Sequence, residues 1–548
     1  MLRDFLIALS LANLCFIRVW PDALNSASAN IYYLKRPLSP FDEAPLILTI
    51  VLLALIMWGS VRLARRARTP CALNVLRWIF LLALTIPLNG IRTQFPFLSL
   101  TASFAHLGQA GTVLLLFTLA VAVTGALVKW YRHLVHASVT IVLIMSPFVL
   151  FTFTALLWPL INHSLTDMAD RSLAPAVAGV EPKPPRIVWM IFDEMDQYVA
   201  FEGRPSSLNL PEFDRFRAQS ISATRVRSPA NMTEESLPAL ITGKQVAEAE
   251  PAGPAELMLT FKDTRNPVQW SRVPNVFSRA REAGINTGVV GWYLPYCRII
   301  ASSLTTCYWH ILESKYGVRA GTTWFDEMVW LPTLIQTLPV PGEFALRERL
   351  ESLLGTKLPE GRNYAKVTVA AYRRMLNEAI KVTTDPHIGL VLVHWPIPHP
   401  PAIYDRHIGD FAYHGLGNYL DNLALVDRTL SRMRKELEAA DLWDSSLILL
   451  TADHGYRDQA WKQSWVADEP NIDIAQIDRH VPFLLKLPYQ KEGLTYDRPF
   501  NSVLIPDLFM AFIHGKISDS KSVTAWLDQH NTQDDSLMVK NCSPSSAC

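Results

Sequence analysis

The stretch LILLTADHG at residues 447–455 decides how this chain folds. Its apolar part has the length and composition of a buried β-strand, and Asp453, His454 and Gly455 follow that strand directly. Before it, over residues 418–440, apolar side chains recur every three or four positions, which predicts a helix with one face packed on a sheet. A helix that leads into such a strand is typical of an α/β domain.

The same alternation of short aliphatic runs and longer helical patterns extends from residue 187 onward and predicts a largely parallel central sheet. The predicted strands are residues 187–192, 285–291, 388–394, 447–451 and 481–487. In open sheets of this kind, ligands bind outside the carboxyl ends of the strands. Asp193 follows the first strand and His394 ends the third, so both are predicted to converge with Asp453 and His454 on one edge of the sheet.

The first third of the chain is strongly apolar and predicts an α-helical transmembrane bundle over residues 1–161. Its five apolar runs are residues 5–17, 44–61, 73–88, 110–128 and 139–161. A spanning helix needs about 20 mainly apolar residues, which the second, fourth and fifth runs supply, whereas the other two are shorter or interrupted. We therefore expect about five spans.

Charges between the runs predict the orientation, because loops that stay in the cytoplasm are enriched in Lys and Arg. The connection after the second run holds Arg62, Arg65, Arg66 and Arg68 and no acid, whereas Arg92 is the only full charge in residues 89–109. This pattern predicts a multi-pass protein of the cytoplasmic membrane with everything after residue 162 outside, in the periplasm of a Gram-negative cell. The first run also fits a cleaved signal sequence, and that alternative leaves the location unchanged.

The remaining boundaries follow from composition. Residues 162–186, rich in proline and small residues, predict an extracytoplasmic linker, followed by a catalytic domain at 187–518 and a polar tail at 519–548. Residues 245–274 and 316–366 look like insertions. Two cysteine pairs, Cys297 with Cys307 and Cys542 with Cys548, are close enough in sequence to form disulfides outside the cytoplasm. The net charge of +1 predicts no nucleic-acid partner.

Thr233 is the candidate nucleophile, in the run NMTEESLP at residues 231–238. A threonine hydroxyl is a weak nucleophile unless a metal or a base lies beside it. The alternative interpretation is a helix N-cap, because Thr and the two acids after it are common at helix starts. The predicted convergence of Asp193, Asp453 and His454 favours the first interpretation.

Together these motifs resemble the alkaline phosphatase superfamily in its sulfatase-like branch, over residues 187 to about 515. The likeness extends to the membrane-anchored enzymes that transfer phosphoethanolamine or phosphoglycerol to envelope glycans and lipids. The family's nucleophile lies ten residues before the glycine of a Thr-Gly pair, and counting back from Gly243 reaches Thr233. Thr233, Ser236 and Pro238 also reproduce the Thr-x-x-Ser-x-Pro pattern of the transferases.

The resemblance implies roles for the other residues as well. Asp193, Thr233, Asp453 and His454 would bind a divalent metal, with Glu194 as a further ligand; this donor set suits Zn²⁺, and Mn²⁺ also accepts it. His399 in a His-x-Pro element and His480 before a Val-Pro strand would contact the transferred group. His394 is a weaker candidate for the same role, as a phosphate ligand or a proton carrier.

The departures from the pattern separate the branches of the family. Sulfatases have Cys or Ser at the nucleophile position within a Cys/Ser-x-Pro-x-Arg frame, where this chain has Thr233, Glu235 and Leu237. They also carry Gly-Lys-Trp where Gly291 is followed by Trp292 and Tyr293. The resemblance therefore implies phosphoryl transfer: a phospholipid donor, a phospho-threonine intermediate on Thr233, and an envelope glycan or lipid acceptor. Two alternatives stay open, a phosphodiesterase or phosphatase and an inactive envelope sensor or scaffold.

Overall fold

The chain forms two compact units, which are described separately. The computed structural model describes residues 1–17, 44–67, 69–93, 129–161, 170–177, 186–252, 255–264, 266–310, 362–412, 417–457 and 480–531, and a few single residues between them. The predicted span at 110–128, the Cys542 and Cys548 pair and most of the 316–366 insertion lie outside the described residues.

The N-terminal unit is a set of apolar helices packed around a small core. Its helices are α1 (Leu2–Cys15), α4 (Ala44–Ala67), α5 (Pro70–Ala83), α6 (Thr85–Thr93) and α9 (Ser146–Ile161). Helix α1 packs against α4 and α9, with Leu11, Phe16 and Ile50 among the buried core residues. Arg65 donates two hydrogen bonds to Asp4, at 2.6 and 2.8 Å, so the N-terminus of the chain lies beside the basic end of α4.

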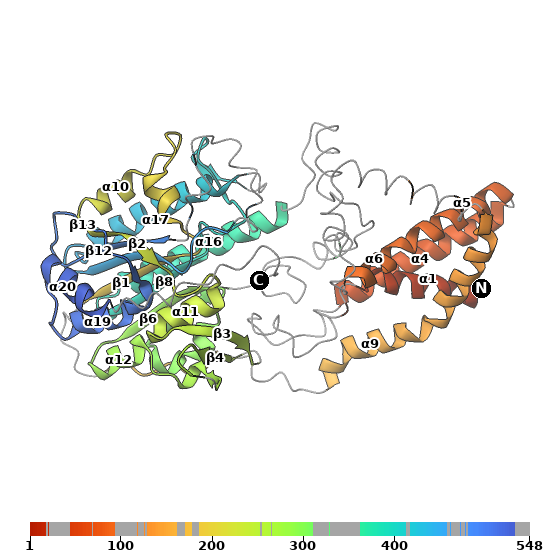
Figure 1. Ribbon diagram of the computed structural model, residues 1–548. Helices are drawn as coiled ribbons and strands as arrows, with labels where there is room; N and C mark the ends of the chain where they lie inside the picture. Colours follow the sequence, from red (N-terminus) through yellow and green to blue (C-terminus); the bar gives the residue numbers. More distant parts are fainter. Residues whose placement is uncertain are drawn as a thin grey trace. The chain divides into compact units, whose positions relative to one another are not determined.

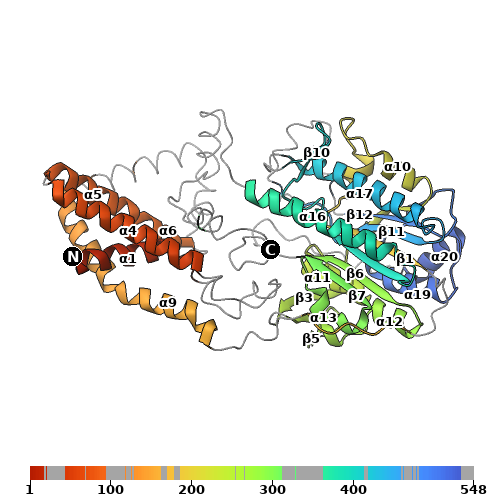
Figure 2. The same cartoon turned by 180° about the vertical axis from the view of Figure 1, so that it is seen from behind.

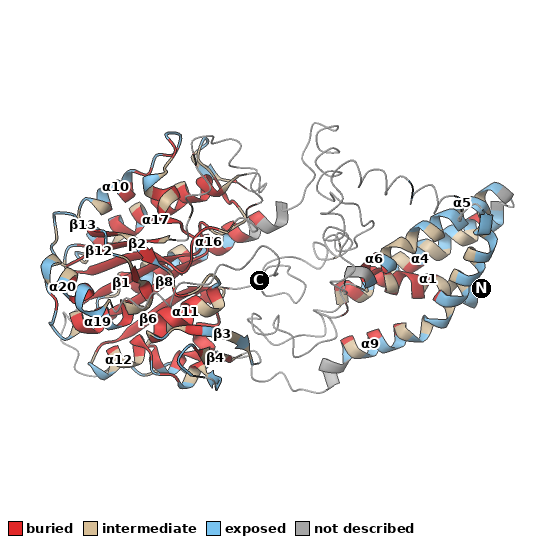
Figure 3. Cartoon of the chain, viewed as in Figure 1, coloured by how far each residue is buried: buried red, intermediate tan, exposed pale blue. Residues whose placement is uncertain are grey.

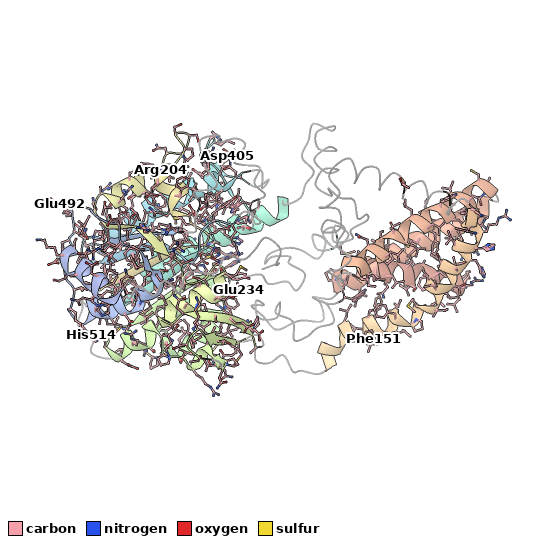
Figure 4. All side chains as sticks on the ribbon, viewed as in Figure 1. Phe151, Arg204, Glu234, Asp405, Glu492 and His514 are labelled. Carbon is pink, nitrogen blue, oxygen red and sulfur yellow. A yellow bond between two sulfur atoms is a disulfide. The ribbon has the colours of Figure 1, made fainter. Side chains whose placement is uncertain are left out.

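Among the described residues of this unit, three helices are long and apolar enough to cross a membrane: Ala44–Arg66, Cys71–Ile91 and Lys129–Leu157. They correspond to the second, third and fifth predicted spans. The first predicted span is a helix of 14 residues, α1, which rises about 21 Å and is shorter than the ~30 Å apolar layer of a bilayer. Phe151 on α9, labelled in Figure 4, is 59% exposed and is one of many large apolar side chains on the outside of these helices. Apolar surface of this extent is typical of helices that contact lipid.

The second unit is built on a mixed, largely parallel sheet, as predicted. Its strand order is β13-β2-β12-β11-β1-β8-β6-β7, with β14 also paired to β2. The strands are β1 (Ile187–Phe192), β2 (Ile221–Arg227), β6 (Thr287–Trp292), β7 (Thr306–His310), β8 (Leu390–Trp395), β11 (Leu447–Ala452), β12 (His480–Lys486), β13 (Leu494–Tyr496) and β14 (Phe500–Asn501). Strands β11, β1, β8, β6 and β7 are mutually parallel, and β12 runs antiparallel to both of its neighbours. All five predicted strands are present, with shifts of one or two residues at some ends.

Helices cover both faces of this sheet (Figure 1). One face carries α10 (Pro211–Arg217), α16 (Arg362–Thr383) and α17 (Tyr419–Ala439), and the view from behind shows the same layer (Figure 2). The other face carries α11 (Thr233–Thr242), α12 (Val276–Glu282) and α19 (Ile505–Ile513). The buried residues concentrate in the sheet and on the inner helix faces (Figure 3). The predicted helix at 418–440 is α17, and the Asn418 side chain caps its N-terminus.

Two segments outside the predicted catalytic domain contact it. In the predicted linker, Arg171 N and Ala174 N donate hydrogen bonds to the carbonyls of Cys297 and Leu304, so residues 170–177 lie along the domain. The polar tail predicted from residue 519 begins with helix α20 (Ser520–His530), whose Val523 and Leu527 are buried. The sequence did not predict this helix, because most of its residues are polar and only a few apolar side chains pack against the domain. The predicted insertion at 245–274 contains a separate antiparallel sheet of β3 (Val246–Pro251), β4 (Leu257–Phe261) and β5 (Val268–Gln269), with β3 against α11.

A disulfide joins Cys297 and Cys307, as predicted, and links the short helix α13 (Tyr296–Ile299) to the edge strand β7. We expect replacement of both cysteines by serine to lower the free energy of unfolding by about 3 kcal/mol, because the bridge closes a loop of about ten residues in the unfolded chain. Chemical denaturation of the protein with and without the pair measures this difference. An unchanged unfolding midpoint would show that the bridge adds no stability.

Candidate functional site

The site lies at the carboxyl ends of four neighbouring parallel strands. Phe192 at the end of β1 aligns with Ala452 on β11 and with Trp395 on β8. The residues that follow β1 and β11, Asp193 and Asp453, therefore emerge side by side. Chain segments separated by more than 200 residues thus meet at one edge of the sheet, as the sequence pattern predicted.

Asp193, Asp453 and His454 form a buried cluster that fits a metal ion. One ligand atom of each lies within 4.8 Å of the others. His454 Nε2 lies 3.5 Å from Asp193 Oδ1 and 3.5 Å from Asp453 Oδ2. Two carboxylates and an imidazole at this spacing are a donor set that divalent zinc or manganese accepts.

The protonation of the cluster supports this assignment. His454 Nδ1 lies 2.9 Å from the carbonyl of Gly455, which can only accept, so Nδ1 carries the proton and the Nε2 lone pair faces the carboxylates. Asp193 Oδ1 is fully buried and has no hydrogen-bond partner. Burial, and then the charge of Asp453, raise the pKa of Asp193 well above its usual range. A cation between the carboxylates would oppose that shift, because it favours the ionised form of Asp193.

Thr233 points its hydroxyl at this cluster. Thr233 Oγ1 donates to Asp453 Oδ2 at 2.9 Å and lies 3.3 Å from His454 Nε2. Thr233 is the first residue of α11, so the positive end of the helix dipole lies at its hydroxyl. One turn later, Ser236 donates to the backbone carbonyl of Asp453, which joins α11 to the loop after β11. Thr233 is the first residue of the helix and not its N-cap, which is Met232, so the N-cap interpretation is wrong.

Glu194, predicted as a further metal ligand, makes a different contact. It is fully buried, and its Oε1 accepts from the backbone N–H of Arg457 at 2.8 Å. The Arg457 guanidinium Nε lies 3.7 Å from the same oxygen, and its Nη1 lies 3.5 Å from Met232 Sδ beside the nucleophile. Burial raises the pKa of Glu194 to about 8, although Arg457 opposes that shift. Glu194 lies outside the cluster of Asp193, Asp453 and His454, but its Oε2 is buried without a hydrogen-bond partner, and its role as a further ligand stays a prediction.

His394 lies deeper in the same site. Its Nε2 is 3.9 Å from Asp193 Oδ2, and its Nδ1 is 2.9 Å from the Tyr296 hydroxyl. Burial lowers the pKa of His394 to about 4, so the imidazole is neutral at pH 7. The Trp292 indole is hydrogen-bonded to Asp193. The sequence analysis did not identify Tyr296 or Arg457 as site residues. It noted Trp292 only because the sequence departs from the Gly-Lys-Trp motif of sulfatases at that place.

His399 and His480 lie at the same edge of the sheet. The backbone N–H of His399 donates to the carbonyl of Asp193 at 3.1 Å, and its Nδ1 lies 2.7 Å from the carbonyl of Pro400. Strand β12, which begins at His480, runs antiparallel to β11, so His480 lies at the end of the sheet where β11 ends. Both side chains are half-buried. Their contact with a transferred group remains a prediction.

The chain has a mixed α/β sheet with a buried Asp/Asp/His cluster and a hydroxyl at its carboxyl edge, which is the arrangement expected of the alkaline phosphatase superfamily in its sulfatase-like branch. A family model described as Sulfatase matches residues 185–514. The chain belongs to this family. Comparison with the curated proteins finds no match.

Solved structures similar to this chain include hydrolases of several ester types. A phosphonate monoester hydrolase of Agrobacterium radiobacter is 14% identical, with 60% of this chain and 74% of that chain covered and a TM-score of 0.40. The PsFucS1 sulfatase from Pseudoalteromonas sp. is 13% identical, with coverage of 61% and 68% and a TM-score of 0.41. A murine ectonucleotide pyrophosphatase/phosphodiesterase is 12% identical, with coverage of 60% and 95% and a TM-score of 0.35.

Proposed function

We propose that this protein is a membrane-anchored phosphotransferase that moves a phospholipid head group, phosphoethanolamine or phosphoglycerol, through Thr233 to an acceptor in the cell envelope. The observation that carries the proposal is the position of the Thr233 hydroxyl, 2.9 Å from Asp453 and 3.3 Å from His454. A threonine cannot be converted to the formylglycine of sulfatases. The nucleophile therefore supports attack on phosphorus by an alkoxide and not sulfate ester hydrolysis.

The first step would load the head group onto the enzyme. The Thr233 hydroxyl gives its proton to the imidazole of His399 or His480, a bond forms between Thr233 Oγ1 and phosphorus, and the bond from phosphorus to the glycerol oxygen of the lipid breaks. A divalent cation held by Asp193, Asp453 and His454 would lower the pKa of the Thr233 hydroxyl and offset the charge of the phosphate. The same imidazole then returns this proton to the glycerol oxygen, and diacylglycerol leaves.

The second step would release the head group to an acceptor. An acceptor hydroxyl attacks the phosphorus, the bond to Thr233 Oγ1 breaks, and Thr233 recovers its proton. His399 and His480 are the candidates for proton transfer at the rim, since an ordinary imidazole titrates near neutral pH. The Arg457 guanidinium, beside Met232 and partly exposed, is placed to contact a phosphate oxygen.

Two structural features support a location outside the cytoplasm. The disulfide between Cys297 and Cys307 belongs to an oxidising compartment. Asp4 forms an ion pair with Arg65, so the N-terminus and the basic end of α4 lie on the same side of the membrane. The enrichment of Lys and Arg in cytoplasmic loops assigns that side to the cytoplasm. A lipid donor in the outer leaflet of this membrane is then in the same compartment as the catalytic domain.

The test is transfer from a labelled lipid. We expect the full-length, metal-loaded protein in vesicles of head-group-labelled phosphatidylethanolamine or phosphatidylglycerol to release diacylglycerol and to carry the label on Thr233 in peptide mass spectrometry. Boiled protein is the control. Diacylglycerol release with no labelled Thr233 would contradict the covalent mechanism, and free phosphoethanolamine or phosphoglycerol as the sole end product in the presence of envelope glycans and lipids would identify a hydrolase instead.

A further inference from the structure

A tyrosine and a histidine lie beside the metal cluster, and both are fully buried. The Tyr296 hydroxyl lies 2.9 Å from His394 Nδ1, and His394 Nε2 lies 3.9 Å from Asp193 Oδ2. The three side chains therefore form a row that ends at a candidate metal ligand. Among the residues that the structure describes, His394 Nε2 has no hydrogen-bond partner. A buried polar atom without a partner, next to a candidate metal site, indicates a role beyond packing.

The Tyr296 hydroxyl decides which nitrogen of His394 carries the proton. In the described part of the chain, this hydroxyl has one hydrogen-bond partner, His394 Nδ1, so it donates to that nitrogen. The imidazole is neutral and holds a single proton, which is then on Nε2. The other groups that act on the imidazole agree with this assignment, because the Asp193 carboxylate and the Trp292 carbonyl are acceptors. The reverse arrangement would leave the phenol proton buried without an acceptor.

Two features hold the ring of Tyr296 in place. A Cβ atom added to Gly291 on β6 would lie 2.2 Å from a ring carbon of Tyr296, so the ring packs directly on the backbone of that strand. The next residue, Cys297, is bonded to Cys307 on β7. The alternative role of the pair is a buried hydrogen bond that only joins α13 to β8. That role does not explain why the second nitrogen of His394 faces the cluster instead of a partner of its own.

We propose that Tyr296 is a positioning residue of the metal site, which holds the imidazole of His394 with its Nε2–H toward Asp193 and so raises the affinity of the cluster for a divalent cation. An N–H directed at a carboxylate favours its ionised form, and the effect is large where water is excluded. Partners that orient metal ligands typically change metal affinity roughly 10- to 100-fold. Because 3.9 Å is longer than a hydrogen bond, we expect the lower end of that range. The inference goes beyond the proposed function, since it concerns metal binding and not the transferred group.

The experiment measures the metal affinity of the full-length protein. Protein stripped of metal is titrated with Zn²⁺, and separately with Mn²⁺, in competition with a fluorescent chelator, which gives the dissociation constant. We expect Tyr296→Phe, which keeps the ring and removes only the hydroxyl, to weaken metal binding roughly tenfold. Tyr372→Phe is the matched control, because its buried hydroxyl is bonded to Thr429 on α17 and not to a residue of the site. It should leave the dissociation constant unchanged.

A double variant tests whether Tyr296 acts through His394. In protein with His394→Leu, Tyr296→Phe should weaken metal binding no further, because no imidazole is left to orient. Additive losses would indicate a general structural effect and would overturn the inference, as would an unchanged affinity in Tyr296→Phe alone or a wild type that binds neither metal. Gly291→Ala keeps the hydroxyl but displaces the ring, and should also weaken metal binding; it serves if Tyr296→Phe does not fold.

Discussion

Thr233→Val is expected to abolish the covalent adduct and to reduce diacylglycerol release by at least about 10³-fold, because the attacking oxygen is lost. Valine keeps the branched shape of threonine in a buried position, so the packing of α11 should change little. The lost hydroxyl leaves Asp453 Oδ2 without its 2.9 Å donor, which costs about 1–3 kcal/mol of stability. Single-turnover assays with labelled lipid and peptide mass spectrometry measure the activity, and chemical denaturation measures the stability.

Thr233→Ser is the matched control, since it restores a hydroxyl at the same position without the methyl group. We expect it to form an adduct of its own and to keep measurable activity. A threonine that only begins the helix would give the reverse pattern, in which Thr233→Val remains active. Full activity of the valine variant would therefore remove Thr233 from the mechanism.

Replacement of two ligands, in the variant Asp453→Ala with His454→Ala, is expected to lower metal affinity by more than about 100-fold. Loss of an outer-shell partner alone typically costs 10- to 100-fold, and these two residues contribute two of the three clustered donors. Only Asp193 would remain of that cluster. Elemental analysis of protein dialysed against a weak chelator measures the metal bound per chain and also identifies it as zinc or manganese.

His514→Ala provides the control for this experiment, because Figure 4 shows His514 well apart from Glu234, the neighbour of Thr233. We expect its metal content to equal that of the wild type. An unchanged metal content in the double variant would contradict the assignment of Asp453 and His454 as metal ligands. Wild-type protein stripped of metal should in addition unfold at a lower temperature, since Asp193 and Asp453 would then face each other without a cation.

The sequence pattern was sufficient for the parts of this molecule that depend on local periodicity. The strand at 187–192 was predicted to the residue, because both of its faces are buried and its apolar run is uninterrupted. The convergence of Asp193 with Asp453 followed from the rule for parallel strands. Strand β2 was missed because it begins buried and ends with alternating exposure, and two arginines and a threonine obscure its pattern.

The groups around the metal site could not be predicted in the same way. Arg457 reaches Glu194 across 263 positions of sequence, and Tyr296 reaches His394 across 98, so neither contact leaves a local signal. The conformation of Tyr293 also depends on tertiary contacts, because nothing in its own residue type favours a positive φ. A motif can locate the residues that carry the chemistry, but the residues that orient them emerge only from the fold.

The bond from Ser236 to the carbonyl of Asp453 has a mechanical consequence. Thr233 and Ser236 lie on the same face of α11, one turn apart, and both are attached to Asp453. The helix that bears the nucleophile and the loop that bears two metal ligands are therefore expected to move as one rigid body. Any motion that admits a lipid or releases its product must then occur in other parts of the molecule. Because the attacking oxygen and the metal ligands are already in place, the binding and release of lipids would then limit the rate of turnover.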